Sequence, residues 1–176
     1  NPSKETSCRF KSGPGHHDMR KQQNLVKLQR IAHMFYKIRY LRFIARLIEI
    51  FIRIIFSARI PAKIDLPKTT FFAHSALGVV INDNCEIRDN VYIGTHVVIG
   101  GNSKSIDVPI IKSNSIIHTG SNILGPITIG EGSVIAPNSV VTNNVAASCL
   151  MAGSPAVIKK ENIKYEDYSP FRQIEI

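Results

Sequence analysis

The side chains best suited to chemistry in this 176-residue sequence are three evenly spaced histidines, His74, His96 and His118. Imidazole titrates near neutral pH, so each histidine is a candidate general base. His74 is the strongest candidate, because it lies in the stretch AHSALGVV (73–80), which interrupts a repeat described below. Zinc ligands usually include a close pair, which this equal spacing lacks, and we therefore expect no metal site.

No nucleophile accompanies these histidines in a recognised arrangement. The sequence contains no GxSxG segment, and its three cysteines, Cys8, Cys85 and Cys149, are scattered without a CxxC pair. So few cysteines fit a reducing cytoplasm better than a disulfide framework. Neither a serine nor a cysteine nucleophile is indicated, and nothing suggests a covalent enzyme intermediate.

Positive charge is concentrated in one part of the chain. The net charge is +9, and residues 19–59 contain ten bases against a single acid, Glu49. A nucleic-acid-binding fold spreads its bases over a face, so this distribution argues against nucleic acid as a partner. It favours one basic helical segment instead.

The N-terminal third divides into a polar stretch and a helical one. Residues 1–18 are rich in turn formers and favour an expression leader or a disordered tail, whereas 19–58 favour one or two basic amphipathic helices. Within 41–56 the four charges fall at helical spacing and form a narrow stripe on an otherwise apolar helix. Such a helix either packs on protein, including a neighbouring subunit, or docks on the inner face of an anionic membrane.

An apolar residue recurs at every sixth position through the second half of the chain. The positions are Ile81, Ile87, Ile93, Ile99, Ser105, Ile111, Ile117, Ile123, Ile129, Ile135 and Val141, and only the serine is polar. Period six is typical of a parallel β-helix, in which each hexapeptide forms one side of a triangular coil. We expect about five coils over 59–160, with aliphatic residues stacked inward, and an irregular or shortly helical tail over 161–176.

The repeat is interrupted twice. An earlier register of Ile60, Leu66 and Phe72 resumes at Ile81 only after three extra residues, which must bulge outward. The second interruption surrounds Ser105, where two glycines, a polar run and a proline predict an extruded loop. Insertions of this kind collect on the binding face of a solenoid.

Four stretches make the sequence resemble the serine acetyltransferase-like branch of the hexapeptide-repeat acyltransferases. They are FFAHSALGVVIN (71–82), VVIGGNSKS (97–105), NILGPITIGEGSVIAPNSVVT (122–142) and AGSPAVIKK (152–160). The resemblance covers about residues 41–160 and implies a left-handed parallel β-helix, a homotrimer and acetyl-CoA as the acetyl donor. Short members of this branch often acetylate sugars of capsules and lipopolysaccharides.

The resemblance also implies roles for individual residues. His74 falls on the family's catalytic histidine, which activates a hydroxyl for direct attack on the thioester, and His96 and Lys104 are candidate substrate contacts. Residues that would bind acetyl-CoA are Gly100, Gly101, Thr119, Ala136, Pro137, Lys159 and Lys160. A spacing of one regular coil predicts that Gly100, His118 and Ala136 stack in one column, with Thr119 and Pro137 in the next.

Two departures from the family bear on the acceptor. The family's Arg-His-Pro, which helps to hold the serine carboxylate, is Asp107-Val108-Pro109 here, and the aspartate before the catalytic histidine is Ala73. These departures favour a sugar of a bacterial surface polysaccharide as the acceptor. Serine O-acetylation for cysteine synthesis and N-acetylation of an aminosugar stay open as alternatives.

Overall fold

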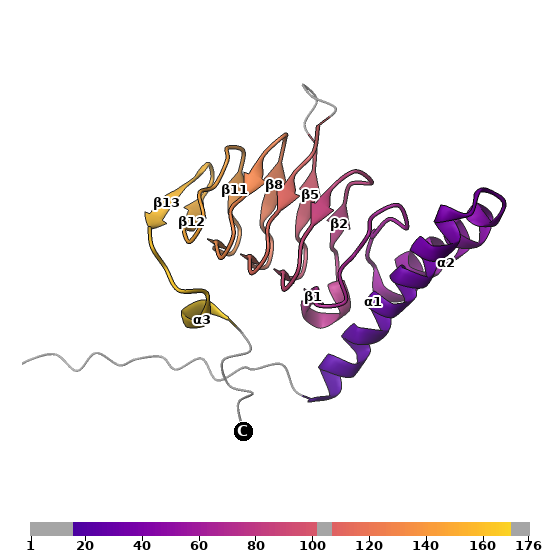
Figure 1. Ribbon diagram of the computed structural model, residues 1–176. Coiled ribbons are helices and arrows are strands. Elements are labelled where there is room, and N and C mark those ends of the chain that lie inside the picture. Colours follow the sequence, from indigo (N-terminus) through magenta and orange to yellow (C-terminus); the bar gives the residue numbers. More distant parts are fainter. Residues whose placement is uncertain (1–15, 102–106, 170–176) are drawn as a thin grey trace, which may run out of the picture.

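The computed structural model describes residues 16–101 and 107–169, with side chains from residue 24 onward. Figure 1 shows a hairpin of two helices at one end of a coil of short strands. The hairpin consists of α1 (His16–Lys37), the 3-10 turn η1 (Arg39–Leu41) and α2 (Arg42–Phe56), so α1 begins slightly before the predicted helical segment. Among the described residues, no helix has the length and hydropathy needed to cross a bilayer.

Side-chain hydrogen bonds tie the hairpin to the segment that leads into the coil. The amide nitrogen Nε2 of the fully buried Gln29 donates to the carbonyls of Pro61 and Ile64, both at 2.9 Å. The Glu49 carboxylate of α2 accepts the backbone N–H of Ala62. The hairpin is therefore packed on the first coil as part of one folded unit.

The strands form three sheets that make the three sides of a triangular coil. The first sheet has the order β1 (Phe71–Phe72), β4 (Tyr92–Ile93), β7 (Ile116–Ile117), β10 (Val134–Ile135), β12 (Leu150–Gly153) and β13 (Ala156–Lys160). The second contains β2 (Val80–Ile81), β5 (Val98–Gly100), β8 (Asn122–Leu124) and β11 (Val140–Val141), and the third β3 (Glu86–Ile87), β6 (Ile110–Ile111) and β9 (Thr128–Ile129). All the named pairs are parallel except β12 with β13, which confirms the predicted left-handed parallel β-helix.

The inward column predicted from the repeat forms the core. None of its ten aliphatic residues, from Ile81 to Val141, exposes more than 3% of its surface, while Ser105 lies outside the described residues. Buried serines join successive coils: Ser121 donates to the carbonyl of Ala136 at 2.9 Å, and Ser133 to that of Ala146 at 2.6 Å. Hydrogen bonding satisfies these hydroxyls without water.

Both interruptions of the repeat are insertions between strands. Strand β10 follows β7 by one regular coil of three hexapeptides, whereas the coil from β1 to β4 is longer. The extra length accommodates the 3-10 turn η2 (Ala73–Ala76), which confirms the predicted bulge. The coil from β5 to β8 is longer by one whole hexapeptide, and this additional length falls in 101–109.

Beyond β13, the short helix α3 (Tyr165–Tyr168) lies at the opposite end of the coil from the hairpin (Figure 1).

Candidate functional site

The bulge that carries His74 has an unusual backbone. His74, Ser75 and Ala76 have φ angles of 47°, 58° and 61°, so three consecutive residues other than glycine adopt the left-handed conformation. Each such residue costs about 1–3 kcal/mol and persists only where its surroundings hold it, as happens at functional sites. The His74 side chain is exposed, in agreement with the predicted outward bulge.

The surrounding structure holds this strained turn on both sides. The Gly78 N–H donates to the Ser57 carbonyl at 3.1 Å, and the Val79 N–H donates to the Ala76 carbonyl at 2.9 Å. Ala73 and Ala76 are buried beneath the turn, and α1 packs against η2. Helix and coil together therefore fix the backbone of the turn that carries His74.

His74 lines an open cleft between the hairpin and the first coil. The cleft has a volume of about 470 Å³ and is lined by Asn24, Ile55, Phe56, Ser57, His74, Ser75 and Leu77. Its wall opposite the coil comes from α1 and the end of α2. The sequence did not indicate this wall, because helical periodicity identifies a buried face without saying which loop that face meets.

The turns that connect the first sheet to the second stack into one edge of the coil, which we call the His74 edge. Besides η2, this edge contains His96, Thr119, Ala136 and Pro137, all of them predicted site residues. The ring of His96 lies against Gly78, where a Cβ atom would come within 2.5 Å of Cδ2 of the imidazole. The structure therefore brings His74 and His96 to adjacent coils of the same edge.

The predicted column of Gly100, His118 and Ala136 is wrong for Gly100 only, because His118 and Ala136 do lie on successive coils of one sheet. His118 and Ala136 follow β7 and β10 on the first sheet, and the His118 N–H donates to the Ile135 carbonyl. Gly100 ends β5 on the second sheet, where its partner is Leu124. The insertion at 101–109 lengthens that coil by one hexapeptide. One regular coil counted from Gly100 therefore ends at His118 on the first sheet, one hexapeptide before the true partner Leu124.

The glycine that stacks on His118 is Gly94, which the sequence analysis did not identify. A Cβ atom at Gly94 would lie 2.4 Å from the backbone nitrogen of Thr119. Beside it, the hydroxyls of Thr95 and Thr119 lie 3.3 Å apart. The Gly94 position therefore requires glycine for close packing of coils, and it could have been found by counting the insertion at 101–109 as one extra hexapeptide.

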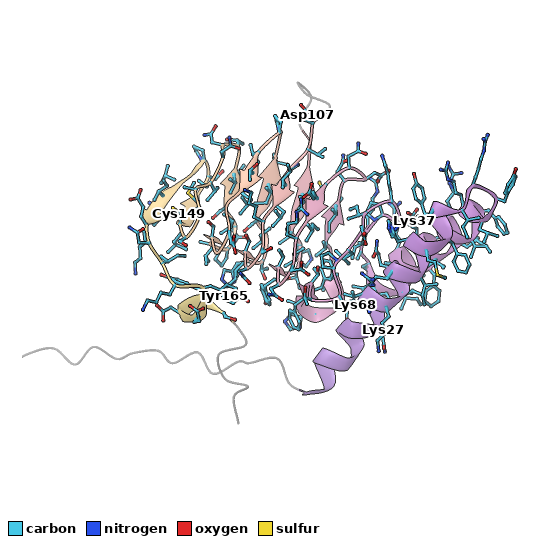
Figure 2. The ribbon with its side chains drawn as sticks, viewed as in Figure 1. Lys27, Lys37, Lys68, Asp107, Cys149 and Tyr165 are labelled. Carbon is cyan, nitrogen blue, oxygen red and sulfur yellow. The ribbon has the colours of Figure 1, made fainter. Side chains whose placement is uncertain are left out.

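Gly100 and Gly101 lie on a different edge, between the second and third sheets, which we call the loop edge. A Cβ atom at Gly100 would meet nothing within 4 Å, so the chain itself leaves open space there. Lys104 belongs to 102–106, outside the described residues. Figure 2 shows Asp107 at the tip of this edge, on the side of the coil away from η2.

Lys159 and Lys160 are exposed at the end of β13. This strand is the last of the first sheet, five strand spacings from β1. At about 4.8 Å per spacing, the lysines lie about 24 Å along the coil from the strand that precedes His74. A ligand that contacted both His74 and these lysines would have to lie lengthwise along the coil.

The pKa of the His118 imidazole is lowered from 6.5, because its burial disfavours the charged form. Its ring tilts toward Tyr92, with centroids 6.1 Å apart. A neutral imidazole can donate one hydrogen bond and accept another, so His118 offers a polar contact without charge. Its side chain is half-buried rather than turned fully to solvent.

The described cysteines belong to the core. Burial raises the pKa of the Cys85 thiol to about 11, so this side chain is not an ionised nucleophile at neutral pH. Cys149 is likewise buried. Within the part of the chain that the structure describes, no three His, Cys, Asp or Glu residues gather as metal ligands.

The coil carries a known repeat. Residues 109–143 match the family described as bacterial transferase hexapeptide (six repeats). The parallel coil and this match show a left-handed β-helix built from the hexapeptide repeat of bacterial transferases, as the resemblance predicted for the fold.

The named relatives are serine acetyltransferases. The serine acetyltransferase of Bacillus subtilis (strain 168) is 38% identical over 137 residues, which cover 77% of this chain and 62% of the relative. The serine acetyltransferase from Brucella abortus strain S19, solved in complex with coenzyme A, matches with a TM-score of 0.77 and 32% identity, over 82% of this chain and 58% of that one. The Neisseria gonorrhoeae enzyme in complex with serine matches with a TM-score of 0.73 and 26% identity, over 80% and 57%.

The chain spans about three-fifths of the length of these relatives. All three are serine acetyltransferases, whereas the sequence analysis favoured the branch that acetylates surface polysaccharides. That finer expectation receives no support from them.

Proposed function

We propose that this protein transfers the acetyl group of acetyl-CoA to a hydroxyl group, with His74 as the general base. The observation that carries the proposal is the position of His74, held in a strained left-handed turn at the mouth of a cleft. The similarity to a serine acetyltransferase solved with coenzyme A supports acetyl-CoA as the donor.

The proposed reaction needs one group that takes up a proton and returns it. His74 removes the proton of the acceptor hydroxyl as its oxygen attacks the thioester carbon, which generates a tetrahedral oxyanion. The oxyanion collapses, the carbon–sulfur bond breaks, and the imidazolium returns the proton to the departing CoA sulfur. The acetyl group ends as an ester on the acceptor, and no enzyme nucleophile takes part.

In this proposal acetyl-CoA lies lengthwise along the His74 edge. Thr119, Ala136 and Pro137 occupy that edge between η2 and the last coil, in a line that suits the pantetheine arm. Lys159 and Lys160 lie at the far end, where two cations suit the phosphates. The acetyl end then reaches His74.

The split of the predicted donor-binding residues over two edges supports a homotrimer. Gly100 and Gly101 lie on the loop edge and cannot line the same groove as Thr119 of their own chain. We propose a closed ring of three copies in which the loop edge of one copy faces the His74 edge of the next. Gly100 and Gly101 would then complete the groove of a neighbouring copy.

L-serine is the acceptor with the most support. The named relatives are serine acetyltransferases, and one of their structures contains serine. The cleft beside His74 also offers polar groups at Asn24, Ser57 and Ser75 to a small hydroxy acid. Serine O-acetylation is therefore the leading assignment.

A carbohydrate hydroxyl is the second candidate, and specific residues favour it. Position 73, where the family has an aspartate, holds a buried alanine, and Asp107 replaces the arginine that helps to hold the serine carboxylate. An acidic side chain would repel that carboxylate, whereas a neutral sugar would tolerate it.

Thiol release from acetyl-CoA, measured with L-serine and with a panel of sugars and surface-glycan fragments, separates these acceptors. Saturable turnover with L-serine supports the leading assignment. Turnover with a glycan but not with L-serine supports a carbohydrate hydroxyl as the acceptor. Absence of acceptor-dependent thiol release with every compound, from protein that binds acetyl-CoA, argues against O-acetyl transfer.

A further inference from the structure

One face of α2 is apolar and open to solvent. Its residues recur at helical spacing and each exposes at least half of its surface: Phe43 (61%), Leu47 (60%), Ile50 (54%), Phe51 (51%), Ile54 (71%) and Ile55 (58%). We call these six residues the outer face of α2. Contiguous apolar surface of this kind marks an interaction site.

The opposite side of α2 fixes which way this face points. Ala45 and Ile52 are buried against the rest of the protein, and Glu49 is bonded to the Ala62 N–H. Packing therefore already occupies the inner side of the helix. The outer face has no such partner among the described residues.

Charge indicates the kind of partner that suits this face. Described residues 24–59 contain the bases Lys27, Arg30, Lys37, Arg39, Arg42, Arg46, Arg53 and Arg59, and a single acid, Glu49. Arg46 and Arg53 are exposed along one border of the outer face and make no hydrogen bond or ion pair with a described residue. In Figure 2 the labelled Lys27 and Lys37 lie at separate points along the hairpin.

A second copy of the chain would bring the same excess of positive charge to this surface. Like charges that meet in an interface cost binding free energy. An anionic partner, in contrast, gains from the arginines while it covers the apolar side chains. An amphipathic helix with Phe and Leu on one side and arginines at its border is suited to the interface of an anionic bilayer.

We propose that the outer face of α2 binds the surface of an anionic lipid bilayer, with the helix lying in the interfacial plane. The proposal is independent of the acetyl-transfer reaction. Ile55 belongs both to the outer face and to the wall of the His74 cleft. Binding through this face therefore places the mouth of the cleft next to the lipid surface.

Co-sedimentation of the full chain with vesicles tests the proposal. We expect binding to phosphatidylcholine vesicles that contain phosphatidylglycerol, weak binding to phosphatidylcholine alone, and partial release by salt. Ile50→Ser should lower the partition coefficient about tenfold. The double variant Arg46→Gln/Arg53→Gln should lower it about 25-fold, because each arginine contributes about fivefold.

Matched variants elsewhere on the coil and in the segment after it control for loss of apolar surface and of charge in general. Ile158, on β13, is 49% exposed, and Lys112 and Lys164 are exposed bases outside α2. Ile158→Ser and Lys112→Gln/Lys164→Gln should leave vesicle binding within about twofold of the parent.

Two results would overturn the proposal. One is vesicle binding that is absent, or that Ile50→Ser leaves unchanged. The other is a fall in molar mass on Ile50→Ser in sedimentation equilibrium without lipid, because the outer face would then be buried between copies of the chain.

Discussion

At the scale of single residues, the fold places its histidines in different environments. His74 and His96 are exposed, whereas His118 is half-buried beside Tyr92 and has a lowered pKa. The sequence identified His74 because an insertion in a strict repeat is visible without a structure. It did not reveal the left-handed backbone of residues 74–76, which depends on contacts with α1 and the first coil.

The lowered pKa of His118 gives stability a pH dependence. Unfolded chains bind a proton at this imidazole below about pH 6.5, where folded chains bind it less. The contribution is therefore fully present above about pH 6.5 and is lost as pH falls toward the lower folded-state pKa. His118→Asn should reduce the fall in Tm between about pH 7.5 and 5.5.

Circular dichroism melts at both pH values check this prediction. His96→Asn is the matched control, since it removes an exposed histidine of the same edge from a left-handed position that asparagine tolerates. An unchanged pH dependence in His118→Asn would show that protonation of this imidazole is not coupled to folding.

At the scale of elements, the turns of the coil separate glycines that look alike in the sequence. A Cβ atom at Gly94 would meet the backbone of Thr119 at 2.4 Å, whereas one at Gly100 would meet nothing within 4 Å. Gly94→Ala should therefore destabilise the protein by about 3 kcal/mol, because backbone cannot move aside. Gly100→Ala should change stability by less than about 0.5 kcal/mol.

The same pair of variants tests the role of Gly100. If coenzyme A approaches this glycine, Gly100→Ala should weaken coenzyme A binding about tenfold while urea-unfolding midpoints stay constant. Calorimetric titration measures the affinity. Unaltered affinity in Gly100→Ala would remove this glycine from the donor site.

The sequence predicted the inward-facing residues of the coil correctly but misplaced a residue at its edges. The core column from Ile81 to Val141 was correct because the insertion at 101–109 adds one whole hexapeptide, which leaves the period of six unchanged. Assignment to an edge depends on counting whole coils, and the insertion at 101–109 adds one side to that count. For this reason Gly100 was placed beside His118, and Gly94 was missed.

At the scale of the whole molecule, we expect the hairpin and the coil to unfold as one cooperative unit. Gln29 bonds to the carbonyls of Pro61 and Ile64 across the junction and is fully buried. Gln29→Ala leaves two carbonyls without that donor and should cost about 2–4 kcal/mol. The loss should appear as one transition at a lower midpoint, with helical and strand signals changing together.

Unfolding in urea, followed by circular dichroism and by hydrogen exchange of coil amides, distinguishes the alternatives. A separate early loss of helix, with coil amides still protected, would show that the hairpin unfolds independently. The helical wall of the cleft would then have to form without help from the coil. Sequence periodicity predicted one or two helices but neither their hairpin nor this junction, because single polar side chains such as Gln29 make the junction.

The most direct test of the central claim is thiol release from acetyl-CoA by the wild-type chain and by His74→Ala, with coenzyme A affinity measured in parallel. If His74 is the base, the variant should lose about 100-fold or more of its turnover while it keeps its fold and its affinity for coenzyme A. Turnover close to that of the wild type would contradict the account, since the strained turn would then hold a residue that the reaction does not need.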